Sequence, residues 1–317
     1  MKNKYDLLKV FAISLVVLGH ITNHYETRIA QLVTLAIYIF HMPLFIAVSG
    51  VVFKIGCDNG KYKEFMPFVL NKFRRLMIPF VVSAVVLVAP TLACCGGSEL
   101  GYVGTVIDIF KGGPSMKHLW FLPALFWMFV MIWGAARIRI NFGIVFIMAL
   151  VASIASNYIP VHCPILGLGN AIQKFPFFVL GMTVVSGKWM KLRGGAIFTY
   201  IALCVLSECV IKWCPCLIVK DVAGIVLSTS AVCCCFCLAD IAWRNLNGSR
   251  ICAYLSKQSF GIYLFHMIPI WFLRYWWHET VALWILIPVT FAVSLIFSIM
   301  ATHVVRRCRL QFLIGER

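Results

Sequence analysis

Acidic side chains are scarce in this sequence. Aspartate and glutamate together number 11, against 28 lysines and arginines, and charged residues make up only 12% of the chain. Soluble domains carry about 25% charged residues, so this composition excludes an ordinary soluble protein. Polar stretches long enough to form a domain outside a membrane are also absent. With 62% hydrophobic residues, the sequence predicts a single all-α integral membrane domain over residues 1–317.

Signatures of several other chemistries are missing as well. The 14 cysteines are scattered, and Cys214 and Cys216 have a poor spacing for metal ligands, so we expect no metal site. No histidine is followed by aspartate five residues later, so the HxxxxD signature of soluble-type acyltransferases is absent. Only Glu208 and Asp240 are carboxylates well inside apolar segments. This scarcity argues against a proton-coupled transporter, which usually needs a carboxylate relay.

Long apolar segments fill the chain instead. About ten of them are candidate membrane spans, near residues 5–22, 30–53, 76–95, 119–136, 142–159, 170–187, 196–212, 221–243, 258–277 and 281–304. Most reach the roughly 20 residues that a helix needs to cross a bilayer. No small-x-small cleavage motif follows the first segment, so we expect a retained span rather than a signal peptide. The expected fold is a polytopic helical bundle with about ten transmembrane helices.

Basic residues alternate between the connections on the two sides of this bundle. With a cytoplasmic N-terminus, 21 of the 28 lysines and arginines fall on the inner side. Six fall on the outer side: Arg28, Lys111, Lys117, Lys212, Lys220 and Arg274. Cytoplasmic loops are enriched in basic residues, so both termini are expected inside. Anionic membrane lipids then account for the net charge of +17 without a nucleic-acid partner.

Two polar side chains interrupt the first apolar segment. Lys9 and His20 are separated by about three helical turns, so they share one helix face and lie about 16 Å apart. Ionisable groups at membrane depth are costly and are functional by default, although Lys9 could also snorkel to the interface. His41, His118 and His266 also fall within spans or at their ends. Several histidines at that depth predict a lined cavity.

Motifs in order along the chain resemble those of a known family. Asp6, Lys9 and His20 form a D-x-x-K-x10-H pattern in the first span. Five further segments follow: IYIFHMPLFIAVSG (37–50), KFRRLMIPF (72–80), HLWFLPALF (118–126), FPFFVLGM (175–182) and SFGIYLFHMIPI (259–270). Together they resemble membrane acyltransferase family 3, which includes polysaccharide O-acetyltransferases, and in particular its fucose 4-O-acetylase-like branch. Lys9 stands where the commonest family motif has arginine, so the charge is kept but the bidentate fork is lost.

The resemblance implies an O-acyltransferase of a bacterial inner membrane. It would move an acyl group, most simply acetyl, from cytoplasmic acetyl-CoA to a hydroxyl of a cell-surface glycan or glycan intermediate, with no permanently bound cofactor. A hydroxyl needs a base near pH 7, and imidazole has a suitable pKa, so His20 is the expected general base. Asn23 or His24, one helical turn further on, is expected to orient its ring.

Further residues are assigned to binding of the substrate or of acyl-CoA: Lys9, Asp6, His41, Ser49, Arg74, Arg75, Trp120, Tyr263 and His266. The basic members lie on the cytoplasmic side, where the CoA phosphates arrive, and Asp6 is placed to pair with Lys9. The hydroxyl and indole groups of Ser49, Trp120 and Tyr263 are candidate donors to the oxyanion. Direct transfer and a covalent histidine intermediate both stay open.

Two other functions remain as alternatives. A transporter or flippase for a glycan or lipid intermediate predicts an inverted repeat of broken spans, and the sequence has no convincing internal repeat. An acyltransferase of another membrane family, acting on lipids or proteins, could use His266 as its lone histidine. That alternative leaves the motif of the first span unexplained.

Overall fold

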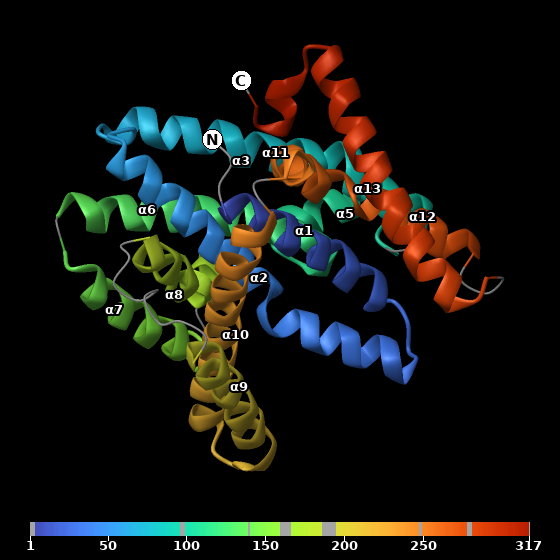
Figure 1. The fold of residues 1–317 in the computed structure, drawn as a ribbon. Helices are drawn as coiled ribbons and strands as arrows, with labels where there is room; N and C mark the ends of the chain where they lie inside the picture. The colour runs from blue at the N-terminus through green and yellow to red at the C-terminus, as the bar shows by residue number, and fades with distance from the viewer. Residues whose placement is uncertain are drawn as a thin grey trace.

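The computed structural model describes residues 4–95, 99–138, 140–158, 166–185, 195–246, 249–277 and 281–316. Over these residues every regular element is helical, as the sequence predicted (Figure 1). Some positions used in the sequence analysis lie outside the described residues: the span ends at 159 and 186–187, and the basic residues Lys2, Arg139, Lys188, Lys191, Arg193 and Arg317.

The described helices follow one another with short connections. In chain order they are α1 (Lys4–Thr22), α2 (Arg28–Asp58), α3 (Phe65–Val82), the π-helix η1 (Ser83–Val88), α4 (Ala89–Cys94), α5 (Gly101–Phe110), the 3-10 helix η2 (Pro114–Trp120), α6 (Phe121–Arg137), α7 (Phe142–Ala155), α8 (Leu168–Val185), α9 (Gly195–Trp213), α10 (Leu217–Leu246), α11 (Arg250–Phe265), α12 (Met267–Trp277), α13 (Leu283–Arg307) and the 3-10 helix η3 (Gln311–Ile314).

Eight helical stretches within the described ranges are long and apolar enough to cross a membrane: Lys4–Thr22, Arg28–Asp58, Phe65–Cys94, Pro114–Arg137, Leu168–Val185, Ala196–Trp213, Leu217–Trp243 and Leu283–Arg307. They confirm the expected polytopic helical bundle. Two expected spans differ. The segment 142–159 contains the 14-residue α7, which is about 21 Å long and shorter than the hydrocarbon layer. The segment 258–277 is divided between α11 and α12.

The division between α11 and α12 falls at His266. Pro269 has no N–H, so it cannot donate to the carbonyl of Phe265 four residues earlier, and its ring crowds that turn. The N–H of His266 still donates to the carbonyl of Ile262 at 3.0 Å, so α11 ends regularly. α12 then runs in a different direction (Figure 1). The chain therefore carries an imidazole at the joint between two short helices.

α1 is the central helix around which the candidate site is built. It packs against α2, α10, α11, α12 and α13. Its small and β-branched side chains, such as those of Ala12 and Val17, are completely buried. At its last turn the hydroxyl of Thr34 in α2 donates to the hydroxyl of Thr22 at 2.7 Å. These contacts fix the face of α1 that carries Lys9 and His20.

The two carboxylates that the sequence places inside spans lie away from this centre. Asp240 of α10 pairs with the ammonium of Lys4 at the first residue of α1, at 2.7 Å. Glu208 is exposed on α9. Neither side chain lines any of the cavities described below.

α2 and α8 approach so closely that glycine is required at their contact. A Cβ atom on Gly50 would collide with the carbonyl oxygen of Phe178, and one on Gly181 would collide with the carbonyl oxygen of Ala47. Small residues allow this kind of close packing between membrane helices. The contact anchors α8 to the helix that contributes Tyr38 and Ser49 to the cavities near α1.

α9 and α10 form a hairpin that projects from the rest of the bundle (Figure 1). α9 packs along α10, and α10 packs in turn against α2 and α1. Large apolar side chains of α9, including Phe198, Val205 and Trp213, are exposed. A helix with this surface suits contact with lipid, because lipid tails are as apolar as these side chains.

Candidate active site

Three histidines from separate parts of the chain meet beside α1. His20 lies in the last turn of α1, His118 in η2, and His266 at the joint between α11 and α12. The ring centroids are 5.3 Å apart for His20 and His266, 5.1 Å for His118 and His266, and 6.1 Å for His20 and His118. We call these three residues the histidine cluster. In the described part of the chain, no group of three or more His, Cys, Asp or Glu side chains is arranged to hold a metal ion.

Hydrogen bonds define the tautomer of His266. Its Nδ1 lies 3.0 Å from the carbonyl oxygen of Ile262 and 2.9 Å from that of Tyr263. A carbonyl oxygen only accepts, so Nδ1 carries the hydrogen and the neutral ring keeps a bare Nε2. That Nε2 is buried and has no hydrogen-bond partner among the described residues. His266 therefore brings an unpaired proton acceptor into the cluster.

The backbone around His118 is held in an unusual conformation. The preceding residue, Lys117, has a φ of 46° and a ψ of −123°. A positive φ of this kind costs a residue other than glycine on the order of 1–3 kcal/mol. The hydroxyl of Tyr263 donates to the carbonyl oxygen of His118 at 2.6 Å, and the two rings are 5.4 Å apart. Both ring nitrogens of His118 are buried without a hydrogen-bond partner in the described structure.

A cleft of about 650 Å³ lies beside His20. Its wall combines aromatic side chains such as Tyr38 and Trp271 with the basic side chains of Lys117 and Arg274. The basic residues belong to the connections that the topology predicts on the outer side. We therefore call it the outer cleft. His20 is half-buried at its edge, whereas His118 and His266 are almost completely buried behind it.

His24 also lines the outer cleft, and its Nδ1 accepts a hydrogen bond from the guanidinium of Arg274 at 2.8 Å. Burial lowers the pKa of His24 to about 4, and the positive charges of Arg274 and Lys117 add to the lowering. His24 is therefore neutral at pH 7. The sequence suggested that His24 or Asn23 orients the ring of His20. In the structure the lone pair of His24 Nδ1 is paired with Arg274 instead, while Asn23 lines the cleft.

A second pocket, of about 350 Å³, lies at the opposite end of α1. We call it the inner pocket. Four basic residues line it: Lys9, Lys72, Arg75 and Lys257. Among its described lining residues Glu316 is the only acid, and its carboxylate is held by the guanidinium of Arg306 at 2.6 and 2.7 Å. The pocket therefore has a large excess of positive charge.

Asp6 and Ser49, which the sequence assigned to binding, both lie near Lys9, and Ser49 lines the inner pocket. The carboxylate of Asp6 lies 3.9 Å from the ammonium of Lys9 and accepts a hydrogen bond from the hydroxyl of Ser256 in α11 at 2.7 Å. Asp6 thus ties the basic end of α1 to α11. Ser49 lines the pocket from α2, and its hydroxyl donates to the carbonyl of Phe45 at 3.0 Å.

Lys72 lines the inner pocket, although the sequence analysis did not include it among the assigned site residues. Its side chain is 7% exposed, and its Nζ lies 3.5 Å from the ring centroid of Phe129 and 5.1 Å from that of Tyr62. Arg74, which was expected in this place, is exposed and does not line the pocket. The sequence did contain a signal for Lys72. Residues three apart on a helix share a face, so Lys72 lies on the same face as Arg75.

Residues 2–303 match the model of acyltransferase family 3, which is described as an acyltransferase domain. That range contains the histidine cluster and all four basic residues of the inner pocket. The chain belongs to acyltransferase family 3. Comparisons with curated proteins and with solved structures found no match.

In this membrane acyltransferase a column of aromatic rings separates the inner pocket from the histidine cluster. Phe45 and Phe121 line the inner pocket, and their ring centroids are 5.2 Å apart. Phe121 lies 5.4 Å from Tyr263, and Tyr263 lies 5.4 Å from His118. Within the cluster, His118 is therefore connected to the inner pocket through two rings, while His20 borders the outer cleft.

Other residues that the sequence assigned to the acyltransferase site take different positions. His41 and Trp120 line neither the outer cleft nor the inner pocket. The Nδ1 of His41 donates to the carbonyl of Ile37 at 2.9 Å, and its ring is 4.8 Å from Tyr38. Tyr263 lies against the cluster, but its hydroxyl is used by the carbonyl of His118.

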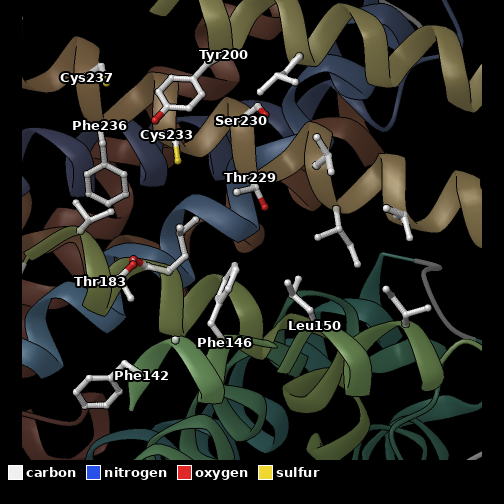
Figure 2. Close-up of a pocket in the computed structure, with 18 of the residues that line it drawn as sticks. Phe142, Phe146, Leu150, Thr183, Tyr200, Thr229, Ser230, Cys233, Phe236 and Cys237 are labelled. Carbon is white, nitrogen blue, oxygen red and sulfur yellow. The ribbon is translucent and has the colours of Figure 1, made fainter. Parts of the chain in front are cut away.

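A further cavity of about 870 Å³ lies between α7 and α8 on one side and α9 and α10 on the other. Figure 2 shows Phe142, Phe146 and Leu150 facing Tyr200 and Phe236 across it. Its wall is mainly apolar, and none of the residues that the sequence assigned to the acyltransferase site lines it. This cavity shares no lining residue with the outer cleft or the inner pocket.

Proposed function

We propose that this acyltransferase moves an acetyl group from cytoplasmic acetyl-CoA to a hydroxyl of a cell-surface glycan or glycan intermediate, with His20 as the general base. One observation carries the proposal. His20 and Lys9 share one helix, but the imidazole borders the outer cleft and the ammonium lines the positive inner pocket. A single helix thereby links a cavity suited to an anionic cosubstrate with a cavity suited to a polar acceptor.

The inner pocket has the charge that the CoA end of the donor requires. CoA carries several phosphate groups, and lysine and arginine are the side chains that bind phosphate. The buried Lys72 and its neighbour Arg75 add to the charge of Lys9. The apolar wall formed by Phe121 and Leu125 suits the uncharged part of the donor that leads to the thioester. The predicted topology puts this end on the cytoplasmic side, where acyl-CoA is found.

The outer cleft has the composition of a site for a polar acceptor. Tyr38, Trp271 and Tyr275 contribute aromatic rings, and Asn23 contributes an amide. Binding sites of this kind combine an apolar surface with a few polar groups that orient the ligand. A sugar presents both C–H faces and hydroxyls, so it matches such a wall.

The proposed reaction exchanges one carbon–sulfur bond for one carbon–oxygen bond. His20 takes the proton of the acceptor hydroxyl as the oxygen attacks the thioester carbonyl carbon. The carbon–oxygen bond forms, the carbon–sulfur bond breaks, and the leaving CoA sulfur finally receives a proton. No oxidant or reductant is needed. A positioned base typically contributes about 10²–10⁴-fold to the rate of such a step.

The test supplies acetyl-CoA with a labelled acetyl group to membranes that contain the protein. Alkali-labile label in the glycan fraction reports O-acetylation. We expect His20→Ala to lower this label by about 10²–10⁴-fold with an unchanged amount of protein in the membrane. His303→Ala is the matched control, because His303 is an exposed histidine of α13 that contacts Tyr254 and lines neither cavity.

Two results would contradict the proposal. Full acetylation by His20→Ala would exclude this histidine as the base. If His20→Ala abolished glycan export but left acetylation intact, the transporter or flippase would be favoured instead. Release of the free CoA thiol, with the labelled acetyl group found outside the glycan fraction, would point to a different acceptor class.

A further inference from the structure

Three unpaired nitrogen atoms lie together in the histidine cluster. They are both ring nitrogens of His118 and the Nε2 of His266, all buried and without a partner among the described residues. A buried polar group without a hydrogen bond costs about 1–3 kcal/mol, and such groups are rare enough to need an explanation. The positive φ of Lys117 adds strain in the same segment. The fold therefore places His118 at a considerable energetic cost.

The chemistry of these rings suits transfer of a proton. Neutral His118 has one N–H donor and one bare nitrogen, whereas His266 offers a bare Nε2 because its Nδ1 hydrogen is held by backbone carbonyls. Ring nitrogens lie at the ring edge, so rotation alone can bring facing nitrogens to hydrogen-bond range where the centroids are 5.1–5.3 Å apart, as they are for His266 with His118 and with His20. His266 can then accept a proton from His20 and pass it to His118, whose ring is 6.1 Å from that of His20.

The positions of the rings give this transfer a direction. His20 borders the outer cleft, where the proposed acceptor hydroxyl loses its proton. His118 packs against Tyr263, which contacts Phe121 in the wall of the inner pocket, so it lies on the side from which the proposed donor reaches the cluster. The thioester sulfur is bonded to the carbon that the acceptor oxygen attacks, so the base for the hydroxyl and the acid for the sulfur are needed on opposite sides of one carbonyl group. His118 and His266 both contact Tyr263 on the donor side, and His118 is the closer, with ring centroids 5.4 Å apart against 6.3 Å.

We propose that His118 delivers a proton to the sulfur of the departing CoA, after His266 has received it from His20. The proposal rests on the proposed function. The hydroxyl proton passes to His20 as the carbon–oxygen bond forms, then through His266 to His118, and ends on the CoA sulfur as the carbon–sulfur bond breaks. All three imidazoles finish neutral, so one proton and one acetyl group are accounted for.

The charges around His118 are compatible with this role. The titratable side chains that face it are His20 from α1, and Tyr263 and His266 from α11 and its joint with α12. Lys117, on its own segment, lines the outer cleft. The described lining of that cleft contains no carboxylate. An imidazolium formed in the cluster thus has no adjacent counter-ion to hold it, which favours passing the proton on.

The alternative is that His118 only fills space between the other rings. Two substitutions separate these roles. His118→Phe keeps an aromatic ring of similar size but cannot carry a proton, whereas His118→Ala removes the ring and leaves a space that free imidazole can enter. His303→Phe and His303→Ala are the matched controls on the exposed face of α13.

The experiment measures labelled-acetyl transfer from acetyl-CoA in membranes, together with release of the CoA thiol. We expect both His118 variants to lower kcat by about 10²–10⁴-fold without a change in KM for acetyl-CoA. Added imidazole should restore part of the rate of His118→Ala, more strongly as the pH rises and the neutral base accumulates. It should not restore His118→Phe, whose ring fills the site.

Wild-type kcat in His118→Phe would overturn the relay, as would a loss in His118→Ala that imidazole does not relieve at any pH. These outcomes are distinct from failure of the proposed function. If the wild-type protein transfers no acetyl group and releases no CoA thiol, the proposed reaction itself is wrong and the relay falls with it. If the wild-type protein is active and His118→Phe matches it, only the relay is wrong.

Discussion

The hydroxyl of Tyr263 donates a hydrogen bond to the backbone carbonyl of His118, with 2.6 Å between the two oxygens. This bond joins α11 to the strained segment that precedes α6. It holds the backbone of His118, whose buried ring makes no hydrogen bond to the described residues. The bond therefore controls where the imidazole sits without occupying either of its nitrogens.

Tyr263→Phe should weaken this control. Removing the hydroxyl leaves the buried carbonyl of His118 without its partner, which should lower the free energy of unfolding by about 1–3 kcal/mol. We also expect a lower kcat, because the imidazole of His118 loses its position relative to His20. Thermal unfolding in detergent and acetyl transfer in membranes measure the two effects. Tyr254→Phe, at an exposed tyrosine, is the control, and equal behaviour of the two variants would contradict the prediction.

Lys72→Met should affect the donor rather than the acceptor. The substitution keeps most of the buried side-chain volume but removes a positive charge from the inner pocket. We expect KM for acetyl-CoA to rise about tenfold, corresponding to loss of one charge-assisted contact of about 1.4 kcal/mol. Acetyl-S-pantetheine, which lacks the nucleotide phosphates, should be used equally by both proteins. Arg74→Met is the control, since Arg74 is exposed outside the pocket, and a similar KM change there would argue against a specific role for Lys72.

Gly181→Ala should separate α2 from α8. The new methyl group would collide with the carbonyl oxygen of Ala47, which is backbone and cannot move aside alone. Overpacking typically costs about 1–3 kcal/mol, and we expect the free energy of unfolding to fall by the top of this range or more. Little folded protein should then accumulate in the membrane. Gly224→Ala in α10 is the control, because an added Cβ there meets no atom within 4 Å. Normal accumulation of Gly181→Ala would contradict the close contact.

His24 should make the stability of the protein depend on acidity. Its pKa in the folded protein is about 4, below its ordinary value of 6.5. As the pH falls, His24 is therefore protonated in the unfolded chain before it is protonated in the folded protein. Its contribution to the free energy of unfolding is fully present above about pH 6.5 and is lost between pH 6.5 and 4. The contribution is at most about 3 kcal/mol.

Comparison of the wild-type protein with His24→Gln isolates this contribution. Thermal unfolding between pH 7 and pH 5 should shift less in the variant, because glutamine can still accept the hydrogen bond of Arg274 but does not titrate. An identical shift in both proteins would assign the acid sensitivity to other groups.

The number of apolar segments predicted the class of fold, because the length of a membrane helix is set by the bilayer. The division at His266 was not predictable in the same way, since residues 258–277 form one mainly apolar segment of about the length of a span. Proline alone was not decisive either. Pro43 and Pro176 lie inside α2 and α8 without ending them, whereas Pro269 accompanies a break. The packing of neighbouring helices decides whether a proline bends its helix or ends it.

His20 and Lys9 could be selected from the sequence because the cost of a polar side chain in a membrane helix is a local property. The roles of His118 and Lys72 could not be read in that way. His118 depends on rings from α1 and α11, and Lys72 depends on the face of Phe129 in α6. Those contacts join segments that are distant in the chain, so a single sequence contains no direct record of them.

The joint at His266 gives this enzyme two short rods in place of one long membrane helix. α11 is held to α1 through Ser256 and Asp6, and α12 is held near the other end of α1 through Arg274 and His24. Their common end carries an imidazole, so any change in the angle between them first displaces that ring. The proposed proton path is thereby tied to the way in which both rods pack against α1.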